Sequence, residues 1–131
     1  MKVSIDTNVY TAFCCGNEQV RDVISKAESI SVSAVVVGEL IYGFRYGTRY
    51  AENRRILDSF LDEPLVSFLP VSLATCDRFG LVAEELRRAG RPIPQNDIWV
   101  AAHAMESGTD FLTFDKHFEA VNGLVLTLLG I

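Results

Sequence analysis

The amino-acid sequence predicts a single α/β domain in which a parallel β-sheet is flanked by helices on both faces. Three observations carry this prediction: short apolar segments alternate with longer segments of helical periodicity, the chain has 131 residues, and 49% of them are hydrophobic. A chain of this length buries an adequate core as one domain, and strands that alternate with helices usually pair in parallel. We therefore expect residues 1–131 to form one domain without internal repeats.

Apolar periodicity assigns the elements along the chain. The predicted strands are residues 2–5, 30–33, 66–71, 110–114 and 124–128. The predicted helices begin with a turn near Thr7 and then cover residues 18–27, 34–44, 49–61, 73–89 and 96–106. Ser33 is well placed to cap the helix that follows it. Pro92 and Pro94 keep the approach to the last helix extended.

Composition narrows the class of protein. No apolar run approaches the roughly 20 residues that a membrane-spanning helix needs, and residues 1–5 resemble a strand rather than a signal peptide. We therefore expect no membrane association and a cytoplasmic location. Cys14, Cys15 and Cys76 lack the spacing of a disulfide framework or a zinc site, and we expect free thiols in small apolar spaces. The net charge of −5 is unusual for a nucleic-acid binder, unless metal ions neutralise a local concentration of acids.

Four acidic residues occupy positions where a parallel sheet binds ligands. Asp6 follows the first predicted strand, Asp115 follows the fourth, Asp97 begins a helix, and Glu39 lies in the helix after the second strand. Ligands bind beyond the carboxyl ends of parallel strands where the strand order reverses. Each acid alone also has a structural interpretation: a turn for Asp6, a helix N-cap for Asp97 and a solvated helix position for Glu39. Their joint placement favours a site.

Clustered carboxylates predict a cation. Two of them about 4 Å apart repel by roughly 4 kcal/mol at an effective dielectric constant near 20. Four carboxylates stay ionised together only if a cation balances them, and otherwise their pKa values rise. Ligand sets made of oxygen alone favour Mg²⁺ or Mn²⁺ over zinc. Such ions bind phosphate oxygens and activate water, so the sequence predicts phosphoryl chemistry.

The motifs around these acids resemble those of PIN-domain proteins of the VapC toxin type, almost from end to end. They are IDTNV around Asp6, GELIYG around Glu39, GRPIPQNDIWVAAHA around Asp97 and FLTFDKHF around Asp115, and VNGLVL near the end also fits. The resemblance implies a five-stranded sheet in the order 3-2-1-4-5 and an endoribonuclease that depends on Mg²⁺ or Mn²⁺. It further implies a homodimer that a cognate antitoxin protein holds inactive. The four acids match the catalytic and metal-binding quartet of that family.

The resemblance also assigns supporting residues. Thr7, Asn8 and Thr113 match polar positions beside the quartet, whereas Pro94-Gln95 replace a more usual glycine-containing approach to the third acid. We expect Asp6, Glu39 and Asp97 to hold one or two metal ions, and Asp115 to bind a second ion or to orient the attacking water. In-line attack on RNA would leave a 5′-phosphate and a 3′-hydroxyl.

The basic residues and the histidines are less informative. Arg91 and Lys116 are close enough to the acids in sequence to favour contacts with RNA phosphates. The substrate grip must come from basic residues outside the acidic cluster, and the further candidates are Arg45, Arg49, Arg54, Arg55, Arg87 and Arg88. Arginines at such positions are more typical of solvated helix faces. His103 and His117 lack metal-ligand spacing, and we expect surface or capping roles for them. The alternative for His117 is contact with the substrate, because it lies near Asp115 in sequence.

Other functions remain open at this point. The acidic site also fits a PIN-type nuclease or a phosphatase that acts on another phosphate substrate, and a non-catalytic module that binds RNA or protein fits the same motifs. Cleavage assays on matched RNA and DNA oligonucleotides would separate them. The apolar and aromatic candidates for an antitoxin groove or a dimer interface are Tyr42, Phe44, Tyr46, Ile56, Leu57 and Phe60.

Overall fold

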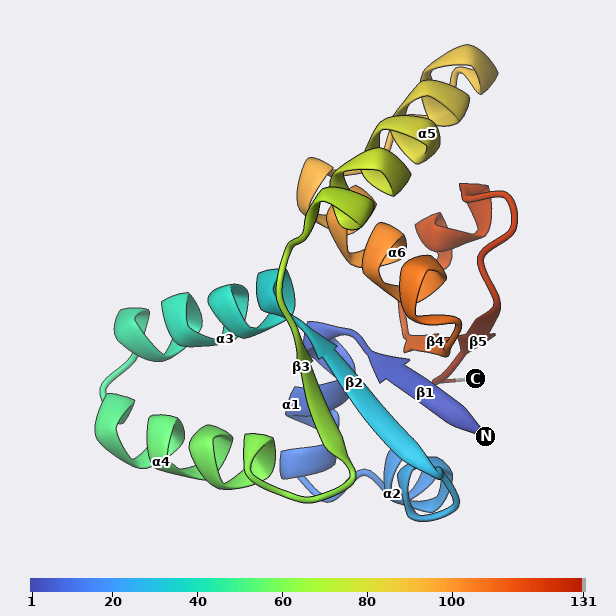
Figure 1. Cartoon of the computed structure of the whole chain (residues 1–131). Helices are drawn as coiled ribbons and strands as arrows, with labels where there is room; N and C mark the ends of the chain where they lie inside the picture. The colour runs from blue at the N-terminus through green and yellow to red at the C-terminus, as the bar shows by residue number, and fades with distance from the viewer. Residues whose placement is uncertain (131) are drawn as a thin grey trace.

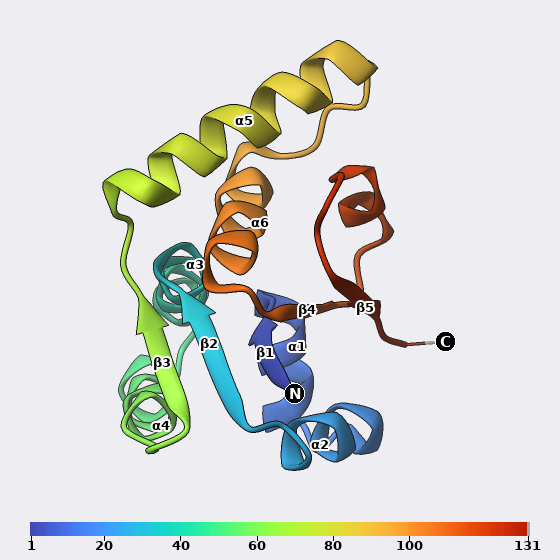
Figure 2. The same cartoon turned by 45° about the vertical axis from the view of Figure 1, so that its right-hand side comes forward.

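The structure, a computed structural model, describes residues 1–130, which form a five-stranded parallel sheet in the order β3-β2-β1-β4-β5 (Figures 1 and 2). The strands are β1 Lys2–Ile5, β2 Ser29–Ser33, β3 Val66–Leu69, β4 Asp110–Thr113 and β5 Leu126–Leu128. The helices are α1 Thr7–Cys14, α2 Glu18–Ser25, α3 Ala34–Tyr46, α4 Tyr50–Leu61, α5 Leu73–Ala89 and α6 Gln95–Ser107, with a 3₁₀ helix η1 Lys116–Ala120. The predicted fold class and strand order are confirmed.

The strand order reverses between β1 and β4. From β1 the chain moves outward to β2 and β3, and α5 and α6 then carry it back to β4 on the other side of β1. The register pairs Ile5 with Leu112, and the backbone N–H of Asp6 donates to the carbonyl of Leu112 at 3.0 Å. The carboxyl ends of β1 and β4 are therefore adjacent, and the crevice beyond them is the expected ligand position in such a sheet.

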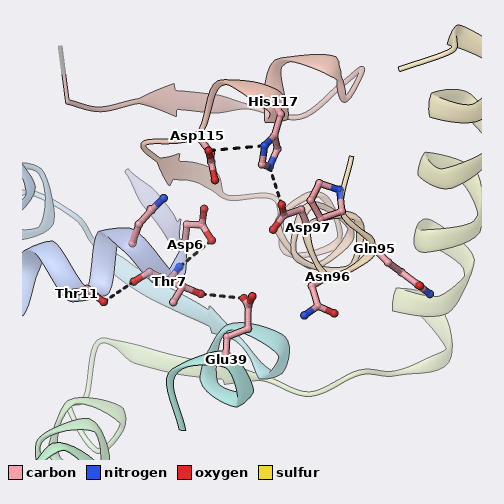
Figure 3. Close-up of a pocket in the computed structure, with 11 residues that line it drawn as sticks. Asp6, Thr7, Thr11, Glu39, Gln95, Asn96, Asp97, Asp115 and His117 are labelled. Atoms are coloured by element: carbon pink, nitrogen blue, oxygen red, sulfur yellow. Dashed lines mark hydrogen bonds and ion pairs between the residues drawn. The ribbon is translucent and has the colours of Figure 1, made fainter. Parts of the chain in front are cut away.

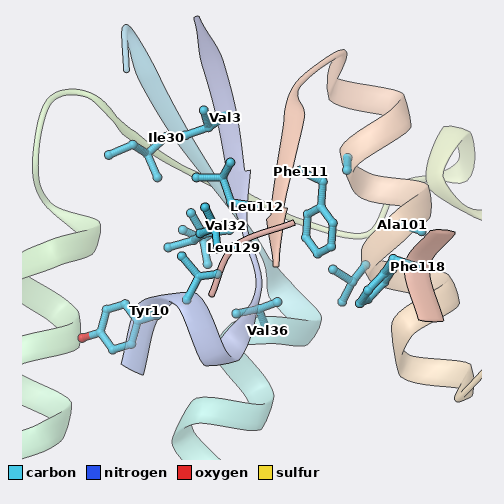
Figure 4. Packing of buried hydrophobic residues seen from close by; sticks show 14 of the residues in the cluster. Val3, Tyr10, Ile30, Val32, Val36, Ala101, Phe111, Leu112, Phe118 and Leu129 are labelled. Atoms are coloured by element: carbon cyan, nitrogen blue, oxygen red, sulfur yellow. The ribbon is translucent and has the colours of Figure 1, made fainter. Parts of the chain in front are cut away.

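The hydrophobic core anchors these two strand ends (Figure 4). Ile5 of β1 and Phe111 and Leu112 of β4 are fully buried. Phe118 of η1 packs edge-on against Phe111, with ring centroids 4.8 Å apart. Burying each of these side chains stabilises the fold by roughly 1.5–3 kcal/mol. The core therefore holds the segment after β4 against the sheet.

A buried polar network joins β2, β3 and α6. The hydroxyl Oγ of Ser33 accepts a hydrogen bond from the backbone N–H of Val35 at 3.0 Å, which confirms the predicted helix cap. The same oxygen lies 2.7 Å from Nδ1 of His103, whose Nε2 lies 3.1 Å from the carbonyl of Pro70. A carbonyl only accepts, so Nε2 of His103 carries the proton and Nδ1 accepts from Ser33. His103 is therefore a structural residue.

Several details differ from the predictions. The strand β3 ends at Leu69 rather than at residue 71, because Pro70 has no N–H to donate to the sheet. The strand β5 begins at Leu126 rather than at residue 124, and η1 was not predicted. The three cysteines are free, as expected, but they are exposed and do not fill apolar spaces. Within residues 1–130, no helix is both long enough and apolar enough to span a membrane.

Candidate active site

A pocket of about 770 Å³ opens beyond the carboxyl ends of β1 and β4 (Figure 3). All four acids line it, and each comes from a different part of the fold. Asp6 joins β1 to α1, Glu39 lies on α3, Asp97 is in the first turn of α6, and Asp115 follows β4. The other lining residues are Thr7, Asn8, Thr11, Pro94, Gln95, Asn96 and His117. The fold therefore brings together the acids that the sequence analysis singled out.

Asp6 is the most tightly held of the four acids. Its side chain is only 4% exposed. Oδ1 accepts a hydrogen bond from the backbone N–H of Thr7 at 2.8 Å, so Asp6 also caps α1. Oδ2 accepts from the hydroxyl of the buried Thr113 at 2.7 Å, and the same hydroxyl oxygen accepts from the N–H of Asp115 at 3.0 Å. Thr113 therefore links the ends of β1 and β4 through the site.

Glu39 is placed by the packing of its own helix. Val36 and Leu40 on α3 are buried in the core, and this leaves Glu39 half-buried at the edge facing α1. Its Oε1 accepts a hydrogen bond from the Thr7 hydroxyl at 3.0 Å. Thr7 therefore holds two acids at once, Asp6 through its backbone and Glu39 through its side chain.

Asp97 contacts a histidine that was misassigned from the sequence. Nε2 of His117 lies 2.7 Å from Oδ2 of Asp97, although the approach is too poorly aligned for a good hydrogen bond. Nδ1 of the same ring lies 3.8 Å from Oδ1 of Asp115. The expectation of a surface or capping role for His117 was wrong, because η1 folds the chain back over the pocket immediately after Asp115. The spacing of two residues from Asp115 was the available signal.

The electrostatics of the pocket are dominated by uncompensated negative charge. Burial raises the pKa of Asp6 to about 6; hydrogen bonds from Thr113 and Thr7 oppose this rise, and the charges of Asp97 and Glu39 add to it. Among residues 1–130, no lysine or arginine lines the pocket.

The pKa of Asp97 is also raised. Burial is the main cause, contact with His117 works against it, and the charges of Glu39 and Asp115 reinforce it. The two raised pKa values have one cause in common, because both acids are partly removed from water beside other acids. The site therefore favours any added positive charge.

The donor set fits a hard divalent cation. Oδ1 of Asn8 is buried, belongs to a pocket-lining residue and has no hydrogen-bond partner within residues 1–130. Asn8 lines the same pocket as the four carboxylates, and an amide oxygen together with carboxylate oxygens is the kind of ligand set that Mg²⁺ and Mn²⁺ prefer. The side chains of the described residues are nevertheless not grouped to hold an ion as they stand.

Neighbouring side chains contact three of the four acids. Oδ2 of Asp6 is turned to the hydroxyl of Thr113, and Glu39 is turned to the hydroxyl of Thr7. Asp97 is turned to His117.

The two basic residues predicted to contact RNA phosphates lie outside the acidic pocket. Arg91 and Lys116 are exposed and do not line the pocket. The N–H of Asp97 donates to the carbonyl of Pro94 at 3.0 Å, and Pro94 itself occupies the cap position of α6. The alternative that Asp97 is merely a helix N-cap is therefore wrong, because the residue lies inside the first turn.

Fold and site together define a class: an α/β domain with an acidic, oxygen-rich pocket where the strand order reverses. The PIN-domain family matches residues 3–124, and the chain belongs to this family.

Named relatives and solved structures extend this assignment. The chain is 30% identical over 90 residues to Ribonuclease VapC4 of Mycobacterium tuberculosis, covering 69% of each protein. It is 29% identical over 128 residues to the tRNA(fMet)-specific endonuclease VapC of Shigella flexneri, covering 95% of each. VapBC2 of Rickettsia felis, solved bound to a DNA fragment from its promoter, has a TM-score of 0.88 at 24% identity, covering 99% of this chain and 100% of that one. At this identity the structural likeness establishes the fold.

Proposed function

We propose that this protein is a metal-dependent endoribonuclease of the VapC type and the toxin of a toxin–antitoxin pair. The observation that carries the proposal is the convergence of Asp6, Glu39, Asp97 and Asp115 on one pocket in a PIN-family chain. The names of its relatives, which are ribonucleases and an endonuclease specific for a transfer RNA, support RNA as the substrate. A toxin that acts on cellular RNA works in the cytoplasm.

We propose Mg²⁺ or Mn²⁺ as the cofactor. Asp6, Glu39 and Asp97 would hold it, with Asp115 available for a second ion or for the attacking water. Such an ion, when bound, supplies Lewis-acid polarisation of the phosphate and lowers the pKa of a water molecule. The raised pKa values of Asp6 and Asp97 support the proposal, because a bound cation would stabilise the ionised form of both groups and lower both pKa values.

The side chains around the quartet have separate tasks in the proposed hydrolysis. Thr113 orients Asp6 through its hydroxyl and Asp115 through the backbone N–H of that residue. Asp115 is exposed at the pocket rim, where it can orient the attacking water and take up its proton. Water attacks phosphorus in line with the leaving 3′-oxygen, and the bond from phosphorus to that oxygen breaks. The 3′-oxygen takes a proton from solvent, so the products are a 5′-phosphate and a 3′-hydroxyl.

A smaller pocket offers a place for the antitoxin. It has a volume of about 220 Å³ and lies between α1, α3 and α4, where Tyr10, Phe44 and Ile56 line it. We propose that an apolar side chain of the antitoxin fills it. The similarity to solved VapBC toxin–antitoxin proteins, such as VapBC-5 of Mycobacterium tuberculosis, supports such a partner. Among the other candidates for this groove, Leu57 is fully buried in the core. A homodimer, implied by the family resemblance, remains part of the proposal.

Cleavage of matched single-stranded RNA and DNA tests the proposed function. With Mg²⁺ or Mn²⁺ the wild-type protein is expected to cut RNA and not DNA, and EDTA is expected to stop the reaction. Asp97→Asn should lower the rate by at least about 100-fold, because several kcal/mol of transition-state stabilisation depend on the ion. Glu119→Gln is the matched control, since Glu119 is an exposed acid near Asp115 that does not line the pocket.

Each alternative function has its own outcome in this assay. Equal cleavage of DNA would favour a nuclease of broader substrate range. Absence of metal-dependent turnover by the wild-type protein would favour a binding module. Either result contradicts the proposal.

A further inference from the structure

The helical hairpin formed by α3 and α4 carries a surface that the acidic pocket does not use. Figure 1 shows α3 running away from the sheet and α4 returning towards it. Residues 42–56, which span the end of α3 and the start of α4, contain four arginines, three tyrosines and one glutamate in a chain whose net charge is −5. Interleaved basic and aromatic residues of this kind are typical of surfaces that bind nucleic acid.

Two tyrosines of this segment form an exposed aromatic pair on α3. Tyr42 is 70% exposed and Tyr46 is 85% exposed, and their ring centroids are 6.4 Å apart. Glu39, Tyr42 and Tyr46 follow one another at intervals of three and four residues, which places them along one side of the helix. Tyr46 lies roughly 10 Å farther along the helix axis than Glu39. The aromatic pair therefore continues the line of α3 outward from the pocket.

Two arginines converge on a third tyrosine beside this pair. The guanidinium of Arg45 lies over the ring of Tyr50, 4.0 Å from its centroid. Arg45 Nη2 and Arg54 Nη1 both donate to the hydroxyl oxygen of Tyr50, each at 3.2 Å. Arg54 is also paired with Asp58 at 3.0 Å, whereas Arg45 has no carboxylate within ion-pair distance in the part of the chain that the structure describes. Guanidinium groups held together in this way present donors for a phosphate oxygen.

We propose that Tyr42, Arg45, Tyr46, Tyr50 and Arg54, here called the tyrosine–arginine surface, bind the single-stranded RNA that enters the acidic pocket. Bases stack on the rings of Tyr42 and Tyr46, and a phosphate lies against Arg45 and Arg54. This inference rests on the proposed function.

The positive charge of this segment favours RNA, with its negatively charged phosphates, as the molecule that binds the tyrosine–arginine surface. The acidic pocket repels phosphates and has no lysine or arginine in its lining among residues 1–130, so the grip on the substrate must come from outside it. The segment 42–56 carries an excess of three positive charges, four arginines against one glutamate. Every base has a face that can stack, so such a surface holds the strand without reading its sequence.

RNA binding by the full chain tests the proposal directly. A short fluorescent single-stranded RNA is titrated in EDTA with protein carrying Asp6→Asn, which prevents cleavage, and binding is followed by anisotropy. Adding Tyr42→Ala or Tyr46→Ala is expected to raise Kd by at least about fivefold, the lower end for loss of one stacked ring. Tyr42→Phe should bind as the parent does. Arg45→Gln should flatten the dependence of log Kd on log salt by about 0.7.

Matched controls come from elsewhere on the chain. Phe68→Ala removes an exposed aromatic ring from β3. Arg21→Gln removes an exposed charge from α2, which Figure 1 places at the opposite end of the sheet from α3. Both controls are expected to leave Kd and the salt dependence unchanged. Circular dichroism checks that each variant is folded.

The results of these experiments distinguish a failure of the RNA-binding inference from a failure of the proposed ribonuclease function. Unchanged Kd in both tyrosine variants overturns the inference even if the wild-type protein cleaves RNA. A wild-type protein that binds RNA through these tyrosines but never cleaves it leaves the inference standing and removes the proposed function. A tyrosine variant that binds RNA normally but loses a protein partner, or that changes oligomeric state on size-exclusion chromatography, also overturns the inference.

Discussion

Replacing Asp6 by asparagine is expected to stabilise the metal-free protein at neutral pH while it abolishes cleavage. The carboxyl group is 4% exposed, and burial, opposed by hydrogen bonds from Thr113 and Thr7, raises its pKa from 3.8 to about 6. Asparagine has nearly the same shape. Its Oδ1 can keep accepting from the Thr7 N–H, and its amide NH2 can donate to the Thr113 hydroxyl oxygen in place of the hydrogen bond that Oδ2 accepted. It carries no charge, so the cost of keeping an ionised group in this place disappears.

The size of the effect follows from the pKa difference. A rise from 3.8 to about 6 is a little over two units, and at 1.36 kcal/mol per unit it corresponds to about 3 kcal/mol. The folded state binds the Asp6 proton more tightly than the unfolded state does. The destabilisation is therefore absent below about pH 4, grows as the pH rises towards 6, and is constant above that. For a chain of this length, about 3 kcal/mol changes Tm by on the order of 10 °C.

Thermal unfolding in EDTA, at equal protein concentrations, measures this difference. Asp6→Asn should melt above the wild-type protein near pH 7.5, and the gap should close near pH 4. Asp22→Asn is the control, because Asp22 is an exposed acid paired with Lys26 at 3.2 Å and its loss should change stability by less than about 1 kcal/mol. A variant that melts at or below the wild-type temperature near pH 7.5, or a gap that persists near pH 4, would refute the reasoning.

Three further predictions concern the residues around the quartet. Thr113→Val removes the donor to Oδ2 of Asp6, so the pKa of Asp6 in the metal-free protein should rise above about 6. The pH at which thermal stability changes in EDTA should then move up by roughly one unit, and Thr113→Ser should leave it in place. His117→Ala removes the ring that contacts and orients Asp97, so calorimetry should show Mn²⁺ binding weakened roughly tenfold. His117→Gln should recover part of this affinity. Equal affinities in the wild-type protein and His117→Ala would rule out a positioning role for His117. Ser33→Ala removes the N-cap of α3 and the hydrogen-bond partner of the buried His103. The free energy of unfolding in urea should therefore fall by about 1–3 kcal/mol, while the Mn²⁺ affinity stays unchanged. A change in Mn²⁺ affinity without a loss of stability would contradict a purely structural role for Ser33 and His103.

The fold and the acids were predictable because strong local patterns placed them. Asp6 and Asp115 each directly follow a short apolar strand, and parallel pairing brings the carboxyl ends of such strands to one edge of the sheet. Glu39 interrupts an apolar helix, and Asp97 follows two prolines that cannot lie inside a helix. Strand order came from the family resemblance rather than from periodicity, which does not distinguish one parallel order from another.

The place of His117 was not predictable from periodicity. The helix η1 is a single short element of five residues, Lys116–Ala120, which is too brief to show a repeat. Its position depends on packing between residues that are apart in sequence, above all Phe118 against Phe111. That packing places His117 next to Asp97. Such a contact becomes visible only when the chain is folded.

The exposure of Tyr42 and Tyr46 was also not predictable from the sequence, because it depends on how α3 packs in the folded chain. Tyr42 and Phe44 are both aromatic residues of an apolar helix. Phe44 packs against the core, whereas Tyr42 is 70% exposed. Which side of α3 faces the sheet decides between the two, and the sequence motif GELIYG leaves that open.

Calorimetric titration of the purified protein with Mn²⁺ tests most directly whether acids from distant parts of the chain form one binding site for divalent cations. We expect saturable binding by the wild-type protein and by Glu119→Gln, and loss of that binding in Glu39→Gln and in Asp97→Asn. Absence of binding by the wild-type protein, or equal affinity in all four proteins, would contradict this expectation.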